Sequence, residues 1–177
     1  FTMAFAAWMT YGVLITYLVD KGVYDWDKAQ MGWLIGIPVL TGSISRLPLG
    51  VLTDKYGGRI VLSVLLIASA VPMFLVGYVD SFMGFMLAGL GFGMAGGSFA
   101  VGIAFTSVWF ERKNQGTALG IFGAGNAGAA ITSMFAPVLL RMLTDDGANI
   151  EGWRTLPQIY AAVLAITGVL FFLFTRP

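Results

Sequence analysis

The chain of 177 residues contains no cysteine, no histidine and few charged residues. Without cysteine it has no disulfide and no thiolate metal site, and without histidine it lacks a common zinc ligand and general base. Charged residues make up 11% of the sequence, against roughly a quarter in soluble domains. The net charge of +1 is spread over scattered basic residues, which gives no field for nucleic acid. We therefore expect no metal, no cofactor, no nucleic-acid partner and no enzyme active site.

Hydrophobic residues are abundant and occur in long runs. They account for 58% of the sequence, and the mean hydropathy is +0.83. A helix needs roughly 20 residues to cross a bilayer, and hydrocarbon favours helices because it cannot satisfy free backbone groups. The sequence therefore predicts an all-α integral membrane domain in a lipid bilayer, with six transmembrane helices at about 1–19, 29–53, 60–79, 81–110, 114–140 and 155–175.

The loops between these runs differ in their basic residues. Basic loops favour the cytoplasmic side of a membrane. The compact loops 54–59 and 111–113 therefore predict a multi-pass protein of the inner membrane with both ends of the chain in the cytoplasm. That side holds Lys55, Arg59, Arg112, Lys113 and Arg176, and the other side holds Lys21, Lys28, Arg141 and Arg154.

Arg46 is a charge inside a predicted span, in "LTGSISRLPLG". An arginine there costs at least ~2.5–3.5 kcal/mol on insertion scales, and the predicted spans offer no Asp or Glu as counterion. Structural explanations are that Arg46 extends toward the cytoplasmic end of its helix or bonds helix carbonyls. The functional explanation is that its counterion is the substrate. A guanidinium donates two parallel hydrogen bonds and stays charged, which suits a small planar anion.

Glycines are concentrated in the fourth and fifth runs. "GFGMAG" and "GAGNAG" match a dinucleotide-binding pattern, but that pattern needs a preceding strand, and both lie inside uncharged runs. Spacing by four residues instead predicts close helix packing. Gly125 and Asn126 are the exception, because an asparagine in hydrocarbon seeks a polar partner and a glycine beside it exposes backbone to a ligand. The glycines expected to pack are Gly89, Gly93 and Gly97, with Gly116 and Gly120.

The loop "GVLTDKYGGR", from Gly50 to Arg59, joins the second and third runs. Its glycines permit a tight turn, and we expect Asp54 to cap the following helix. Any short basic loop is the simpler explanation. The spacing G-x3-D-x2-G-x-R nevertheless resembles the signature loop of the major facilitator superfamily. In that family the aspartate and arginine belong to a charge network that latches two halves, and the resemblance assigns this role to Asp54 and Arg59, with Gly50 and Gly57.

Three longer stretches resemble the nitrate/nitrite porter (NarK-type) family of that superfamily. They are "FAAWMTYGVL", "PVLTGSISRLPLGVLTDKYGGRIV" and "GGSFAVGIAFTSVWFERKNQGTALGIFGAGNAGAA". The resemblance implies that residues 1–177 are the N-terminal half of a transporter whose C-terminal six-helix half is absent from this chain. It also implies that this half consists of two inverted three-helix repeats.

The same resemblance implies transport of nitrate or nitrite by alternating access, as antiport or as proton symport. Arg46 would be one of two arginines that bind the anion, with Asn126, Gly125, Phe99 and Tyr11 bordering it. Trp8 and Phe105 are further aromatic candidates for the cavity wall, although most aromatics in a membrane protein face lipid or other helices. The alternatives are a carrier of the same fold for another small anion, such as formate or oxalate, and a non-transporting membrane sensor or assembly protein.

Overall fold

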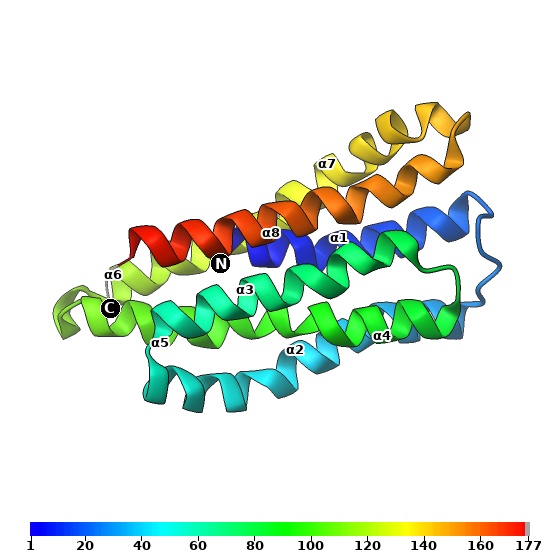
Figure 1. The fold of residues 1–177 in the computed structure, drawn as a ribbon. Helices are drawn as coiled ribbons and strands as arrows, with labels where there is room; N and C mark the ends of the chain where they lie inside the picture. The colour runs from blue at the N-terminus through cyan, green and yellow to red at the C-terminus, as the bar shows by residue number, and fades with distance from the viewer. Residues whose placement is uncertain (176–177) are drawn as a thin grey trace.

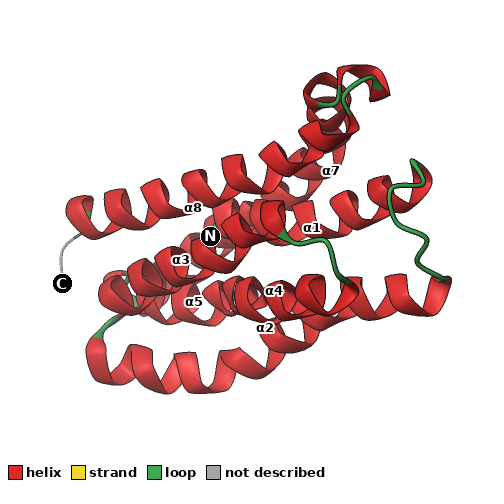
Figure 2. Ribbon diagram, turned by 45° about the vertical axis from the view of Figure 1, so that its right-hand side comes forward, coloured by secondary structure: helices red, strands yellow, loops and turns green. Residues whose placement is uncertain are grey.

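The computed structural model describes residues 1–175 as a bundle of helices joined by short loops (Figures 1 and 2). Six helical spans are long and apolar enough to cross a membrane, which confirms the predicted number. They are α1 (Thr2–Asp20), α2 (Lys28–Tyr56), α3 (Gly58–Leu75) with η1 (Val76–Tyr78), α4 (Phe82–Gly93) with η2 (Met94–Gly97) and α5 (Ser98–Trp109), α6 (Arg112–Gly123) with η3 (Ala124–Asn126) and α7 (Ala127–Leu143), and η5 (Ile150–Arg154) with α8 (Thr155–Phe174). A short turn, η4 (Asp145–Gly147), precedes the last span.

The two ends of the bundle carry different loops. The end with residues 54–59 and 111–113 is called the basic end below, and the end with residues 21–27, 79–81 and 144–149 is called the acidic end. Arg176, which was counted among the basic residues, lies outside the described residues. At the acidic end Asp27 begins α2 with a capping box, in which its Oδ1 accepts from the Gln30 amide at 2.7 Å.

The second span is longer than predicted. It continues to Tyr56 because neither glycine nor proline interrupts it between Val51 and that residue, and Gly57 then turns the chain with φ of 83°. Asp54 lies in the last turn of α2, so the prediction that it caps the next helix is wrong. The N-cap of α3 is Gly57, which has no side chain to donate or accept. Pro38 and Pro48 lie inside α2, which bends along its length in Figure 1.

The spans pack in a pattern that repeats itself. The first span lies along the fifth (α1 with α7), the second along the fourth (α2 with α4, η2 and α5), and the third along the sixth (α3 with α8). Exchanging spans one to three with spans four to six turns the first pair into the second and leaves the third pair unchanged. This pattern is the one expected of two three-helix repeats related by a pseudo-two-fold axis.

Glycines bring α2 and α4 together, as their spacing predicts. A Cβ on Gly93 would lie 2.7 Å from Pro38 Cα, and one on Gly97 would meet Leu49 and Ser45. Gly89 packs against Ile37 and Pro38 at ordinary contact distance. No neighbour among the described residues lies within 4 Å of a Cβ placed on Gly116 or Gly120, so close packing of these two glycines stays a prediction. Both glycines are exposed on α6.

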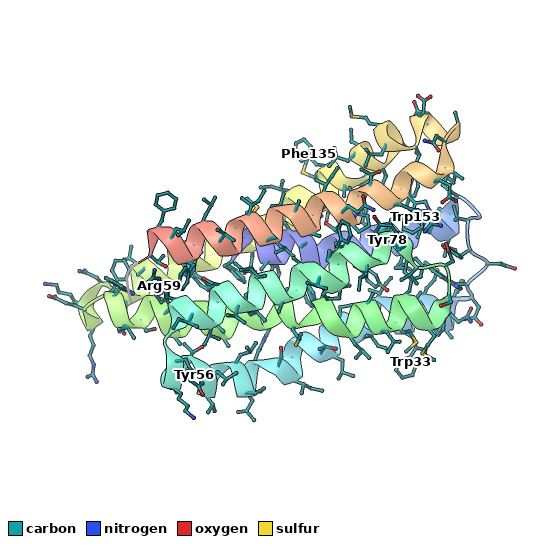
Figure 3. The ribbon with its side chains drawn as sticks, viewed as in Figure 1. Trp33, Tyr56, Arg59, Tyr78, Phe135 and Trp153 are labelled. Atoms are coloured by element: carbon teal, nitrogen blue, oxygen red, sulfur yellow. The ribbon has the colours of Figure 1, made fainter. Side chains whose placement is uncertain are left out.

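Large side chains occupy both the interior and the outer surface of the bundle. Trp153, Phe85 and Phe92 are fully buried, whereas Trp33 is 62% and Phe135 is 58% exposed. Figure 3 shows Trp33 and Phe135 pointing away from the bundle. Exposed apolar side chains of this size are expected where a helix faces lipid or another membrane-embedded surface.

Candidate functional site

Arg46 lies midway through the membrane-spanning part of α2. It precedes the helix end at Tyr56 by ten positions, or about 15 Å at 1.5 Å per residue, which is half of the roughly 30 Å hydrocarbon thickness. Its side chain is exposed on the surface of this bundle. Within residues 1–175 its guanidinium has no ion pair and no hydrogen bond, so bonding to helix carbonyls does not account for it.

An aromatic cluster formed by Phe1, Phe99 and Phe122 lies beside this charge. The Cζ of Arg46 is 5.5 Å from the centroid of the Phe99 ring, within the range of a cation–π interaction. The Phe99 centroid is 6.0 Å from that of Phe122 and 5.5 Å from that of Phe1. Phe1 and Phe122 stack at 4.7 Å. The cluster therefore brings together the first, fourth and fifth spans beside the unpaired guanidinium of Arg46.

The glycine-asparagine stretch of the fifth span reaches the same cluster. Gly125 lies in η3, a short break in the α-helix, and a Cβ there would lie 2.6 Å from Phe1 Cδ1. Short 3₁₀ segments inside a helix often mark functional positions. Asn126 follows with an exposed side chain. The structure thus connects Arg46, Phe99 and Gly125 through the cluster, with Asn126 next along the chain.

Tyr11 belongs to a different neighbourhood. Its side chain is 1% exposed, its hydroxyl donates to the carbonyl of Phe85 at 2.7 Å, and its ring centroid is 4.8 Å from that of Phe92. Trp8 donates from Nε1 to the carbonyl of Pro38 at 3.2 Å. These contacts make Tyr11 and Trp8 part of the packing between α1 and its neighbours. The aromatic contacts of Tyr11 among the described residues are with Phe85 and Phe92 and not with the Phe1, Phe99 and Phe122 cluster.

Phe105 is also held by helix packing rather than by the cluster. It lies under Gly58, where a Cβ would come 2.7 Å from Phe105 Cβ, and its ring meets that of Phe171 at 5.4 Å. The contact fixes the start of α3 against α5 near the basic end. Phe105 therefore stays with the structural residues.

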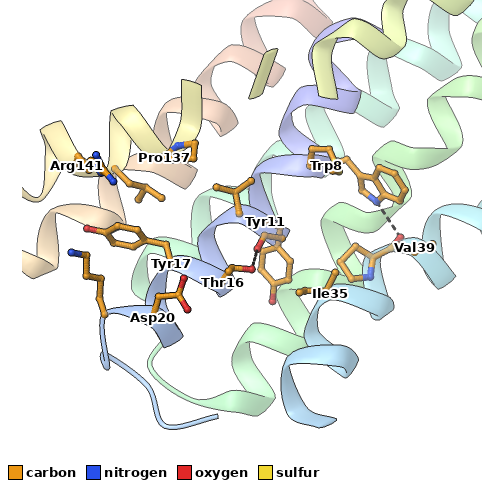
Figure 4. Close-up of a pocket in the computed structure, with 15 residues that line it drawn as sticks. Trp8, Tyr11, Thr16, Tyr17, Asp20, Ile35, Val39, Pro137 and Arg141 are labelled. Atoms are coloured by element: carbon orange, nitrogen blue, oxygen red, sulfur yellow. Dashed lines mark hydrogen bonds between the residues drawn. The ribbon is translucent and has the colours of Figure 1, made fainter. Parts of the chain in front are cut away.

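A cavity of about 580 Å³ lies between α1, α2 and α7 (Figure 4). Tyr17, Asp20 and Arg141 line it near the acidic end, and Trp8, Tyr11 and Pro38 line it further into the bundle. Most of the other lining side chains are apolar. Arg46 is not among the residues that line it. The cavity therefore lies apart from Arg46, nearer the acidic end of the bundle.

The signature-loop residues lie at the basic end (Figure 3). Arg59 donates from Nε and Nη2 to the carbonyl of Phe172 at 2.9 and 2.6 Å, and its guanidinium lies 4.4 Å from the Phe172 ring. Arg59 thus joins the start of α3 to the end of α8. Asp54 is exposed and forms no ion pair among residues 1–175. Gly57 makes the turn, and Gly50 has open space around it.

Sequence reasoning missed Phe122 and Phe1. A signal for Phe122 was present, because Arg46 precedes the end of its span at Tyr56 by ten positions, Phe99 precedes the end of its span at Trp109 by ten, and Phe122 follows the start of its span at Arg112 by ten. Because all three helix ends lie at the basic end, equal spacing places these residues at one depth.

Comparison with known proteins gives a consistent result. The family model described as Major Facilitator Superfamily matches residues 1–177. A probable nitrate/nitrite antiporter NarK1 from Thermus thermophilus is 40% identical over 178 residues, covering 97% of this chain and 40% of that protein. A probable nitrate/nitrite transporter NarK2 from Mycobacterium tuberculosis is 35% identical over 169 residues, and a nitrite extrusion protein from Bacillus subtilis is 32% identical over 164. They cover 93% and 92% of this chain, which spans about 40% of the length of each of these relatives.

Proposed function

We propose that this chain, which belongs to the Major Facilitator Superfamily, forms the N-terminal half of a secondary carrier for nitrate and nitrite. Its six spans make it a multi-pass membrane protein. The relatives at 40%, 35% and 32% identity, which are named for nitrate or nitrite, support this substrate class. Their greater length supports a second half as the main partner, since the chain spans about 40% of each.

The observation that carries the proposal is Arg46. It is a permanent cation near mid-membrane with no carboxylate partner in the described chain, and the face around it is apolar and aromatic. A transported anion supplies the missing counterion, and the planar fork of the guanidinium matches the oxygen atoms of nitrate or nitrite. An anion that meets the edges of these rings is favoured over a cation, because the edge is the positive part of the aromatic quadrupole.

The carrier works by alternating access between its two halves. Arg46 binds the anion on this half, Phe99 borders it, and Gly125 with Asn126 approaches it from the fifth span. The second half supplies another cation. Two cations facing an empty site repel one another, so bound anion lowers the barrier to closure. Exchange of one anion for another follows from this barrier, and proton symport is the alternative mode.

The two ends of the bundle take different roles in this cycle. The basic end faces the cytoplasm of a cell with this protein in its inner membrane, and α8 ends on that side, whereas Phe1 lies deeper in the bundle beside Phe99 and Phe122. The cavity between α1, α2 and α7 offers an approach from the acidic end. Asp54 and Arg59, at the basic end, contribute to the contacts that close the cytoplasmic side.

The test is counterflow of labelled nitrate into liposomes that contain the purified full-length protein. Vesicles loaded with nitrite or nitrate are expected to take up label, and external formate or oxalate is expected not to compete. Competition by formate or oxalate in preference to nitrate would assign the carrier to another anion. Absence of any anion flux would favour the non-transporting reading. Repeating the assay with an imposed pH gradient separates exchange from proton symport.

A further inference from the structure

The Phe122 ring of the aromatic cluster occupies space that is free only because residue 102 is a glycine. Gly102 is buried on α5, and a Cβ on it would lie 2.3 Å from both Cε2 and Cζ of Phe122. The Phe122 ring from α6 therefore lies directly against the α5 backbone. No other residue type at position 102 leaves room for the ring in this position.

Phe99 and Gly102 are neighbours on one face of α5, because they are three residues apart. The Phe122 ring above Gly102 is thus placed next to Phe99, with the two centroids 6.0 Å apart and the planes inclined by 43°. Phe1 lies against both rings, at 5.5 Å from Phe99 and 4.7 Å from Phe122. Phe99 is therefore confined by two rings on the same face on which it meets Arg46.

Arginine is a long, flexible side chain, and Arg46 has no polar partner in the described chain to hold it. Its contact among these residues is the Phe99 ring, 5.5 Å from its Cζ. A fork that is already oriented loses less freedom when it binds a planar anion, so orientation increases affinity. The orientation of Arg46 consequently depends on what fixes Phe99.

We infer that Phe122 is a positioning residue for the anion site: seated on Gly102, it holds Phe99 against Arg46 and so orients the guanidinium. Among the described residues the cation–π contact of Arg46 is with Phe99 and not with Phe122. The inference rests on the proposed function for its consequence in transport. Its geometric part, that Phe122 restrains Arg46, has an independent readout.

The transport test uses the full-length protein in nitrate-loaded liposomes. Phe122→Leu, and Phe122→Met as a variant that better conserves volume, are expected to raise the KM for nitrate about three- to tenfold, the size of an aromatic-pair contribution. Phe99→Leu raises the KM as well, and Phe122→Leu adds no further increase in the Phe99→Leu background. Gly102→Ala raises the KM in the wild type but not in the Phe122→Leu background, where no ring meets the new methyl group.

The second readout is the rate at which phenylglyoxal, an arginine-selective reagent, modifies Arg46, followed by peptide mass spectrometry. The rate is expected to rise severalfold in Phe122→Leu, Phe122→Met and Phe99→Leu, because the guanidinium is then free to move. Phe135→Leu, on the same span but exposed and outside the cluster, is the control and leaves both the rate and the KM unchanged.

The outcomes separate this inference from the proposed function. An unchanged phenylglyoxal rate in folded Phe122→Leu and Phe122→Met protein overturns the inference, whether or not nitrate is transported. Additive KM effects of Phe122→Leu and Phe99→Leu overturn it too. Absence of nitrate flux in the wild type overturns the proposed function, while the modification rate still decides whether Phe122 positions Arg46.

Discussion

Arg46 carries a charge whose cost its neighbours among the described residues do not offset. Placing an arginine at the centre of a span costs about 2.5–3.5 kcal/mol on insertion scales. The contact with Phe99 at 5.5 Å is worth about 0.5–1 kcal/mol, and about 2 kcal/mol at most when the pair is desolvated. This difference agrees with the proposal that a transported anion serves as the counterion of Arg46.

At the same residue scale, glycines at Gly93 and Gly116 differ in what surrounds them. A Cβ on Gly93 would lie 2.7 and 2.9 Å from Pro38 Cα and O, which are backbone atoms that cannot rotate away. Gly93→Ala is therefore expected to lower the free energy of unfolding by about 1–3 kcal/mol. Gly116→Ala, with open space around it, is expected to be neutral or slightly stabilising because alanine favours the helix.

Thermal and denaturant unfolding of the two glycine variants in detergent measures this difference. The wild-type protein and both variants are compared at the same detergent and protein concentrations. Equal unfolding midpoints for Gly93→Ala and Gly116→Ala would show that the contact between α2 and α4 does not depend on the missing side chain.

The residues of the candidate site differ in how well the sequence alone predicts their roles. Arg46 stands out because a charge interrupts an apolar run, and its lack of a partner is visible in the sequence. Tyr11 lines the cavity between α1, α2 and α7, and the sequence could not show that its hydroxyl bonds the Phe85 carbonyl and takes part in helix packing. Phe122 was missed because its importance depends on Gly102, a residue on another helix.

At the scale of elements, the acidic end is held together by one side chain. Arg154 donates to Asp80 Oδ1 and to Glu151 Oε2, both at 2.5 Å, and to the carbonyl of Gly77 at 3.1 Å. Tyr24, from the loop after α1, donates to the same Asp80 oxygen at 3.3 Å. Arg154 and Glu151 at the start of the last span are therefore linked to Asp80, in the loop between the third and fourth spans. Through Asp80 they are also linked to Tyr24, in the loop between the first and second spans.

This network makes a pH-dependent prediction. The hydrogen bond from Arg154 holds the pKa of Asp80 below its ordinary value of 3.8. Since the folded pKa is lower than the unfolded one, the carboxylate stabilises the fold above pH 3.8, and the contribution disappears as the pH falls through the folded pKa. Asp80→Asn is thus expected to lower the melting temperature at pH 5–8 and to have a progressively smaller effect as the pH falls below 3.8.

The measurement is the melting temperature of the full-length protein in detergent between pH 2.5 and 8. Asp25→Asn is the matched control, because Asp25 is an exposed carboxylate at the same end with no ion pair among residues 1–175. A difference between Asp80→Asn and the wild type that stays constant down to the lowest pH would contradict an electrostatic role for Asp80.

Elements were predicted well in number and less well at their ends. Apolar length alone determines that a run spans a bilayer, so six spans follow from the sequence. Their ends depend on local signals such as the Asp27 capping box, and charged residues do not end a helix that has reached the interface. Asp54 and Lys55 therefore belong to α2, whereas the sequence places them in the loop.

At the scale of the whole molecule, the bundle exposes the features that a second half would cover. Arg46 and Asn126 are exposed, and both are polar side chains within membrane-spanning helices. The self-similar pairing of spans shows that the three-helix repeats already satisfy one another within this bundle. The exposed polar residues are therefore available for contacts beyond this bundle. This agrees with a chain that spans about 40% of the length of its relatives.

The central claim is that Arg46 binds a planar anion through both arms of its guanidinium. Its most direct test is the KM for nitrate counterflow of Arg46→Lys in the full-length protein, with Arg112→Lys at the exposed basic end as control. Lysine keeps the charge but loses the fork, and a charge-assisted hydrogen bond contributes about 1.5–3 kcal/mol. The account predicts a KM at least about tenfold higher for Arg46→Lys and no change for Arg112→Lys. Full nitrate transport by Arg46→Lys with an unchanged KM would contradict it.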